Sequence, residues 1–246
     1  MPSPLPRTVH DLVEQQVQRW MAEQQRRAAE KRVEVPRPII TVSRQAGTRG
    51  TDLARGVAGV LGYRLWDQEL VQQIAEQSGA PEGLMRAVDE RARNAIEDLL
   101  AGILMGDAST EKDYVARLTK LFHAIAHHGS AVVVGRGAQY VIASEESLRV
   151  RVIAPLDVRA HTLADVRKLP IAAARGEVER LDRERHGFIK HHYKRDANDP
   201  AAYDLVVNVG TLTPTQAIDV VVAAYRAKFP KVGPVSVRPS SPAPAL

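Results

Sequence analysis

A short polar stretch, residues 43–51, carries the groups best suited to bind phosphate. Its sequence is SRQAGTRGT; an apolar run from residue 39 to 42 precedes it, and an amphipathic segment begins at Thr51. Glycines such as Gly47 and Gly50 allow positive φ angles, so successive backbone N–H groups can surround an anion. The N-terminus of the following helix adds a partial positive charge. The pattern therefore indicates a phosphate-binding loop between a strand and a helix.

The loop departs from the usual phosphate-loop pattern, G-x-x-x-x-G-K-[ST]. Aligned with the nucleotide-kinase form G-x-x-G-x-G-K-G-T, it has Arg49 where lysine is usual. Ser43 and Thr48 stand where the first and third glycines would be. A guanidinium can still bridge phosphates, although it forks across two oxygens where an ammonium acts as a point charge. A plain two-glycine turn between a strand and a helix remains the alternative interpretation.

Five short apolar runs alternate with amphipathic stretches along the chain. The runs are 39–42, 63–66, 131–134, 148–154 and 203–208. Helices are expected over 51–61, 68–77, 81–105, 111–128, 157–195 and 214–229. Without hairpin signals, this alternation predicts an α/β domain with a parallel sheet. In such sheets ligands bind beyond the carboxyl ends of the strands, where the polar loop lies.

Both ends of the chain look appended to this domain. Residues 1–7 and 230–246 are rich in proline and are expected to be disordered. A stripe of apolar residues between 8 and 32 predicts an amphipathic helix, which could dock on the main domain or form a homodimer with a second copy. The predicted organisation is therefore a start over 1–35, a domain over 36–229 and a tail over 230–246.

The composition excludes several classes of protein. The chain has no cysteine among its 246 residues, which excludes disulfides and thiolate chemistry. No apolar run reaches the ~18 residues of a membrane helix, and the start lacks the apolar centre of a secretory signal, so we expect a cytoplasmic protein without a membrane partner. A net charge of +5 and 4% aromatic residues argue against a nucleic-acid partner.

Six segments occur in an order that resembles the cytidylate-kinase-like family, a divergent branch of the P-loop nucleoside monophosphate kinases. They are ITVSRQAGTRGTDLA, LGYRLWDQELVQQIAEQSG, VVVGRGAQYVIA, RVRVIAP, ERLDRER and YDLVVNVGTLTPTQAIDVV. The resemblance implies an α/β P-loop NTPase three-layer fold with a five-stranded parallel sheet. It also implies a helical acceptor region over about 68–128, a helical lid over about 157–199, ATP and Mg²⁺ as cofactors, and small-molecule nucleotides as partners.

The resemblance further implies roles for individual positions. The ATP phosphates would lie on Ser43, Arg44, Gly47, Thr48, Arg49, Gly50 and Thr51. The acceptor nucleotide would lie near Asp67, Arg136 and Arg180, with Arg136 on its phosphate. The residues expected to assist transfer are Arg49, Asp182, Arg183 and Arg185. Lid arginines of this kind would neutralise charge on the phosphoryl group as it moves.

Several of these residues also have a simpler structural interpretation. Asp67 could cap the helix that begins at residue 68, as Asp does well. Arg136 could be an ordinary charge at a strand end, and Asp182 could pair with Arg185 three residues on. The adjacent pair His191 and His192 points in different directions on a helix, which argues against a metal site.

Two departures from the family leave the function open. The family's Gly-Arg-Asp motif reads Gly-Arg-Gly over 135–137, so a carboxylate expected near Mg²⁺ is missing, and the loop has no lysine. Asp67 or Asp157 could substitute for that acid. We predict an ATP-dependent kinase acting on CMP or dCMP. The alternatives are a nucleotide-binding regulatory or scaffold protein that retains the kinase fold, and a kinase for a different small acceptor.

Overall fold

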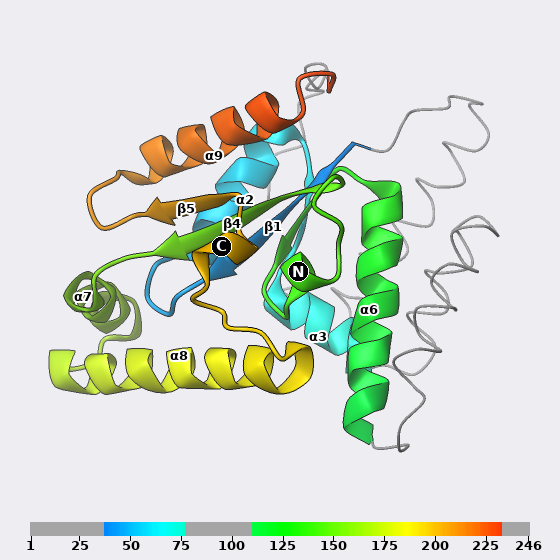
Figure 1. Cartoon of the computed structure of the whole chain (residues 1–246). Helices are drawn as coiled ribbons and strands as arrows, with labels where there is room; N and C mark the ends of the chain where they lie inside the picture. The colour runs from blue at the N-terminus through cyan, green and yellow to red at the C-terminus, as the bar shows by residue number, and fades with distance from the viewer. Residues whose placement is uncertain (1–36, 77–109, 233–246) are drawn as a thin grey trace, which may run out of the picture.

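The structure, a computed structural model, describes residues 37–76 and 110–232. Its centre is a five-stranded sheet with strand order β2-β3-β1-β4-β5, in which every pair is parallel (Figure 1). The strands are β1 (Ile39–Arg44), β2 (Arg64–Trp66), β3 (Ala131–Val134), β4 (Ser147–Ile153) and β5 (Leu205–Asn208). The predicted five-stranded parallel sheet is therefore confirmed.

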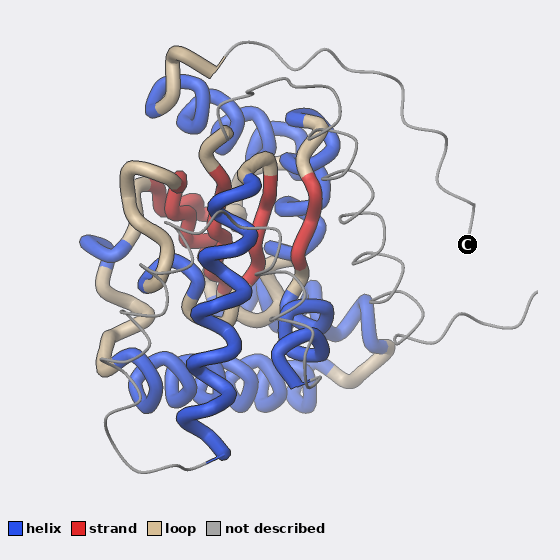
Figure 2. The backbone as a smooth tube through the Cα atoms, turned by 90° about the vertical axis from the view of Figure 1, so that its right-hand side faces the viewer, coloured by secondary structure: helices blue, strands red, loops and turns tan. Residues whose placement is uncertain are grey.

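Helices connect successive strands, as parallel pairing requires, except between β3 and β4, where the described chain forms only a 3₁₀ turn. They are α2 (Gly50–Leu61), α3 (Gln68–Glu76), α6 (Thr110–His128), α7 (Leu156–Arg167), α8 (Ile171–Tyr193) and α9 (Pro214–Lys228), with short 3₁₀ turns η1 (Ala138–Tyr140) and η2 (Pro200–Ala202). Helices α2 and α9 cover one face of the sheet, and α3 and α6 cover the other (Figure 1). Figure 2 shows α6 crossing in front of the strands.

Alternating side chains along the strands build a core on each face of the sheet. In β1, Ile39 packs with residues of α3 and α6, whereas Ile40 and Val42 pack with residues of α2 and α9. In β3, Val133 belongs to the first core and Val132 to the second. The strands are apolar on both sides because helices cover both faces, and this rigid sheet fixes the turns that follow its strands.

The helix predicted over 157–195 is in fact two helices, so that prediction is corrected. Helix α7 ends at Arg167, its C-cap Lys168 takes the left-handed conformation with φ 56°, and α8 begins after Pro170. Proline has no N–H to donate and disfavours helical backbone in the residue before it, so the chain turns there. The two helices pack on the loop after β1 through a small apolar cluster of Ala46, Leu163, Ala164, Ala174 and Val178.

The other predicted helices agree with the structure to within one residue at each end. The segments 51–61, 68–77, 111–128 and 214–229 correspond to α2, α3, α6 and α9. The helices predicted over 8–32 and 81–105 lie outside the described residues. Over 37–76 and 110–232, the chain forms no helix that is both long enough and apolar enough to cross a membrane.

Candidate functional site

Two glycine-containing turns meet at the carboxyl edge of the sheet. One is the loop after β1, and the other, residues 135–137, follows β3. The turns are neighbours because β1 pairs with β3, and the amide of Gly135 donates to the carbonyl of Val42 at 3.0 Å. Between them and α8 lies a cavity of about 210 Å³, which we call the arginine-lined cavity. Its wall includes Arg44, Arg136, Arg151 and Arg185, together with Glu184.

The loop after β1 has the geometry of an anion-binding turn. Gly47 and Arg49 are both left-handed, with φ 77° and 55°. A side chain at Gly47 would overlap the backbone of Arg159, and a Cβ at Gly50 would come within 2.6 Å of the Arg44 Cβ. The N-cap residue Arg49 makes no side-chain cap bond, and the amides of Gly50 and Thr51 precede the first hydrogen bonds of α2, which run from Asp52 and Leu53 to the Arg49 carbonyl. These amides and the helix dipole together suit a phosphate group.

Side chains at the non-glycine positions of the loop hold it to β4 and the residue after that strand. The Thr48 hydroxyl donates to the carbonyl of Gln45 at 2.8 Å. The amide of Ala154 in turn donates to the side-chain oxygen of Gln45 at 3.1 Å. Ser43 Oγ accepts a hydrogen bond from the Arg151 guanidinium at 2.7 Å. The substitutions that weaken the sequence match are thus used to fix the loop.

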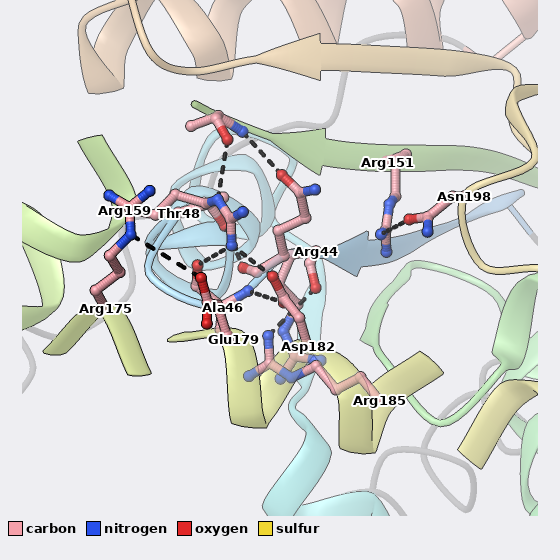
Figure 3. A network of polar contacts seen from close by, with 12 residues as sticks. Arg44, Ala46, Thr48, Arg151, Arg159, Arg175, Glu179, Asp182, Arg185 and Asn198 are labelled. Atoms are coloured by element: carbon pink, nitrogen blue, oxygen red, sulfur yellow. Dashed lines mark hydrogen bonds and ion pairs between the residues drawn. The ribbon is translucent and has the colours of Figure 1, made fainter. Parts of the chain in front are cut away.

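A ring of polar contacts ties the loop to α7 and α8 (Figure 3). Asp182 on α8 accepts one hydrogen bond from the amide of Ala46, at 2.7 Å, and a second from the guanidinium of Arg159 on α7. Arg159 closes the ring by donating to the carbonyl of Ala46 at 3.2 Å, and it also donates to that of Ala154 at 2.9 Å. Asp182 is therefore bonded to the loop and to α7. Arg159 was not identified from the sequence, because its burial, at 7% exposed, arises only in the fold.

Arg44 extends from the end of β1 into the arginine-lined cavity. Its guanidinium donates to Gln68 Oε1 on α3 at 2.8 Å, and Arg185 donates to its backbone carbonyl at 3.2 Å. Burial, followed by the nearby guanidiniums of Arg185 and Arg136, lowers the pKa of Arg44 to about 9, which leaves it charged at neutral pH. An anion bound here would offset both effects. The cavity therefore suits a ligand with more than one negative charge.

Arg151 completes the cationic wall from β4. It is 9% exposed, donates to Asn198 Oδ1 at 3.1 Å, and lies 5.8 Å from the centre of the Tyr203 ring. Burial likewise lowers the pKa of Arg185 on α8. Arg151 was not assigned to the site from the sequence. The signal that could have identified it is its place near the carboxyl end of β4, two residues after Arg149 in the run SLRVRVI, because an arginine in a strand covered on both faces needs polar partners.

The turn after β3 holds Arg136 in a strained conformation. Residues 135–137 have φ angles of 80°, 51° and 79°, and the left-handed region is costly for a residue that has a side chain. The Arg136 guanidinium lies over the ring of Phe188 on α8, 5.0 Å from its centroid. Any side chain at Gly137 would overlap the ring of Tyr193. The aspartate expected from the family motif therefore has no room at this position.

Two predicted residues of the β1 and β2 ends lie outside this cavity wall. The side chain of Arg49 is 62% exposed and pairs with Asp52 at 2.8 Å. Asp67 accepts a hydrogen bond from the amide of Leu70 at 2.9 Å, so it caps α3, although its charge also acts on Arg44. For Asp67 the structural interpretation thus holds, and the residue still borders the site.

The predicted lid residues separate into two groups. Arg185 and Asp182 face the sheet edge, as described above. Arg180 instead pairs with Glu177 at 2.8 Å and with Glu184, and Arg183 is exposed. Asp157, considered as a metal-facing acid, is exposed and paired with Arg175. The structure thus brings Ser43, Arg44, Arg136 and Arg185 together and leaves Arg180 and Arg183 on the outside of α8.

A second cavity, of about 180 Å³, lies beside the loop and the first turns of α2. We call it the apolar cavity, because its wall is largely aliphatic. It is lined by Gly47, Thr48, Arg49, Asp52, Leu53, Ala154, Val158, Thr162, Val209, Leu212, Pro214, Ala217 and Ile218. An apolar cavity next to amides that could accept a phosphate is a suitable arrangement for a nucleotide, whose base is flat and whose phosphates are charged.

Known proteins resemble this chain over most of its length. Residues 39–211 match the model of the cytidylate kinase-like family. A cytidylate kinase from Methanothrix thermoacetophila is 27% identical over 190 residues, covering 77% of this chain and 98% of that protein. A cytidylate kinase from Haloarcula marismortui is 27% identical over 195 residues, covering 78% of this chain and 91% of that protein.

The fold is shared with a solved structure as well. The crystal structure of an uncharacterized protein from Eubacterium ventriosum matches with a TM-score of 0.61 at 18% identity, covering 78% of this chain and 99% of that one. Together with the strand order and the loop after β1, the comparisons confirm the three-layer α/β P-loop fold and support a nucleotide kinase. The chain belongs to the cytidylate kinase-like family.

Proposed function

We propose that this protein transfers the γ-phosphoryl group of ATP to a nucleoside monophosphate, with CMP or dCMP as the acceptor. The arginine-lined cavity carries the proposal, because four guanidiniums converge there between two glycine turns. A phosphate monoester carries close to two negative charges at neutral pH, which matches such a wall. The names of the matching relatives, cytidylate kinases, support the choice of acceptor.

The donor nucleotide is proposed to lie on the other part of the loop. The apolar cavity would take the base of ATP, and the amides at the start of α2 would take its phosphates. Arg44 is then the cation that replaces the missing lysine, since it lines the arginine-lined cavity next to the loop while Arg49 is paired with Asp52 in solvent. This assignment moves the principal loop cation from Arg49 to Arg44.

In the proposed reaction, an oxygen of the acceptor phosphate attacks the γ-phosphorus of ATP. The bond from that phosphorus to the β,γ-bridging oxygen breaks, and ADP leaves with the electron pair. Arg136 holds the acceptor phosphate, while Arg44 and Arg185 offset charge on the transferring group. Phosphoryl transfer depends mainly on such positioning and electrostatic stabilisation, so no covalent intermediate is required.

The described residues do not form a Mg²⁺ site of their own. Over 37–76 and 110–232, no three His, Cys, Asp or Glu side chains gather in a way that could hold a metal ion. Asp67 is bonded to an amide of α3, Asp157 is paired with Arg175, and Asp182 is bonded to the loop. The steps proposed above therefore assign roles only to arginines and backbone amides of this chain; a Mg²⁺ ion brought by ATP would be held mainly by its phosphates and water.

A nucleotide-binding regulator is the second candidate, and one observation favours it. Arg49 stands at the aligned position of the lysine but points to solvent, so the loop lacks a cation at its usual place. A protein of this kind would bind ATP without efficient transfer. Binding without turnover across a panel of acceptors distinguishes it from a kinase, and the same panel detects a different small acceptor.

A coupled assay of ADP release tests the proposal with ATP, Mg²⁺ and each nucleoside monophosphate in turn. We expect release that depends on CMP or dCMP and that falls about 100-fold or more in Arg44→Ala, as for loss of one preorganised charge. Arg226→Ala, an exposed arginine on α9, is the matched control. If no acceptor gives ADP release but calorimetry shows that the protein binds ATP, the regulator is favoured. Absence of ATP binding would contradict both candidates.

A further inference from the structure

The strained turn at residues 135–137 needs something to hold it, because three successive left-handed residues include the non-glycine Arg136. Tyr193, the last residue of α8, donates its hydroxyl hydrogen to the backbone carbonyl of Arg136 at 2.7 Å. Burial raises the pKa of Tyr193 well above its usual range, so the hydroxyl stays protonated and remains a donor. The end of α8 therefore fixes the backbone of this turn.

The side chain of Arg136 is oriented by an aromatic ring from the same helix. Its guanidinium lies over Phe188, 5.0 Å from the ring centroid, and also donates to Gln72 on α3. Arg136 Nε is buried and has no hydrogen-bond partner among the described residues, so the ring face supports this part of the group. Phe188 is itself held edge-on by Tyr114, with ring centroids 6.5 Å apart.

The glycine at position 137 is matched to this arrangement. The Tyr193 ring packs where a Cβ of residue 137 would lie, so the ring can occupy its place because residue 137 lacks a side chain. Phe188 and Tyr193 are also in contact distance of each other, with centroids 6.3 Å apart. The tyrosine at the end of α8 thus occupies the space that the aspartate of the family motif would need.

We propose that Phe188 and Tyr193 are positioning residues for Arg136. The ring of Phe188 aims the guanidinium into the arginine-lined cavity, and the Tyr193 hydroxyl holds the strained backbone that carries it. This inference rests on the proposed function, in which Arg136 holds the acceptor phosphate. Phe188 is also part of the cavity wall, whereas Tyr193 is not, and in this proposal both residues act by fixing the position of Arg136. Acceptor binding should therefore depend on them more strongly than ATP binding does.

The kinetic test separates the Michaelis constants of the two substrates. We expect Phe188→Leu to raise the KM for CMP about fivefold to tenfold, the range of a partly desolvated cation–π contact, and to leave the KM for ATP within about twofold. Phe188→Tyr, which keeps a ring face, should restore the KM for CMP. Phe229→Leu is a matched control, because Phe229 has a similar contact with Lys228, at 5.6 Å, away from the cavity. Equal changes in both Michaelis constants would overturn the inference.

A second measurement needs no turnover, so it distinguishes failure of this inference from failure of the proposed function. In ¹H–¹⁵N spectra, the Nε–H signal of Arg136, assigned with Arg136→Lys, should carry an upfield shift from the Phe188 ring. We expect Phe188→Leu to abolish that shift and both Phe188→Tyr and Phe229→Leu to retain it. Tyr193→Phe, which keeps the packing beside Gly137, should broaden or move the Arg136 amide signal. An unchanged Arg136 Nε–H in Phe188→Leu would overturn the inference even in an inactive protein.

Discussion

The two turns at the sheet edge are held by the same helix in different ways. The loop after β1 is bonded to α8 through a polar ring in which Asp182 accepts from Ala46 and from Arg159. The turn after β3 is packed against the aromatic rings of Phe188 and Tyr193. A carboxylate fixes a backbone amide by directional hydrogen bonds, whereas rings fix a guanidinium by shape and by their π-faces. The two turns should therefore respond to different substitutions.

Arg44 lies between the two turns, so its removal should have the largest effect. Arg44→Ala is expected to lower kcat/KM for CMP by about 100-fold or more, because it removes a charge that is already in place for the transferring group. The coupled ADP-release assay measures this change. Arg44→Lys keeps the positive charge but lacks the two-pronged donor geometry of a guanidinium, so it should recover part of the lost kcat/KM. A kcat/KM for CMP in Arg44→Ala close to that of Arg226→Ala would contradict the proposed role of Arg44.

Gly137→Ala tests how the turn after β3 packs against the aromatic rings of α8. A Cβ at this position overlaps the Tyr193 ring, and residue 137 has φ 79°, so we expect a loss of about 1–3 kcal/mol in the free energy of unfolding. The KM for CMP should rise while the KM for ATP changes little. Gly59→Ala is the matched control, since Gly59 is exposed in α2 with open space around it, and it should gain stability by about 0.5–1 kcal/mol. Chemical denaturation measures both values; equal stability of the two variants would count against the packing described.

Asp182→Asn tests the hydrogen bonds that hold the loop after β1 to α8. The substitution removes the charge that Ala46 and Arg159 share, and hydrogen bonds to charged groups contribute about 1.5–3 kcal/mol. We expect the KM for ATP to rise about tenfold and the KM for CMP to change much less, the reverse of Gly137→Ala. Glu179→Gln, an exposed acid on the same helix, should leave both constants unchanged. A rise confined to the KM for CMP would reverse the assignment of the two turns.

A charge cluster outside both turns should affect stability without affecting activity. Burial alone would raise the pKa of Asp204, but hydrogen bonds from Arg149 and Lys228 outweigh it and hold that pKa well below its usual range. A depressed carboxyl pKa contributes stability above the unfolded value, about 3.9, and this contribution is lost as the pH falls toward the folded value.

We therefore expect Asp204→Asn to lower the free energy of unfolding at pH 7 by about 1 kcal/mol, because the pair is partly exposed. The difference from the parent should shrink as the pH falls below about 4. Denaturant unfolding at several pH values measures it, with kcat as the control. A difference that grows as the pH falls would contradict a depressed pKa for Asp204.

The fold was predictable from the sequence because its elements have strong local signals. The buried runs at Ile40 and Val132 and the glycine after α2 identify strands and a helix end without tertiary information. The sequence pattern predicted one helix over 157–195, where the structure has α7 and α8. Pro170 indicates the break between them, but the charged residues continue on both sides of it and favoured a single helix.

The site was only partly predictable, because its residues are joined by contacts across the sheet edge. Arg49 and Arg44 are five positions apart, and the sequence cannot tell which guanidinium enters the cavity; the left-handed φ of Arg49 directs its side chain to Asp52. Arg159 and Arg151 bind partners that are distant in the chain, so neither spacing nor charge identifies them. Asp182 was expected in the site, but its bond to the loop amide depends on how α8 docks.

If the arginine-lined cavity holds the acceptor phosphate, loss of Arg136 must weaken binding of the acceptor and spare binding of ATP. Steady-state kinetics of the parent and of Arg136→Ala, with CMP and ATP varied separately, measures both effects. We predict CMP-dependent ADP release by the parent, and in the variant a KM for CMP raised more than about tenfold with a KM for ATP within about twofold, as expected when one charged contact to a phosphate is lost. A KM for CMP in Arg136→Ala equal to that of the parent, or a rise in the KM for ATP instead, would show that the cavity does not hold the acceptor phosphate.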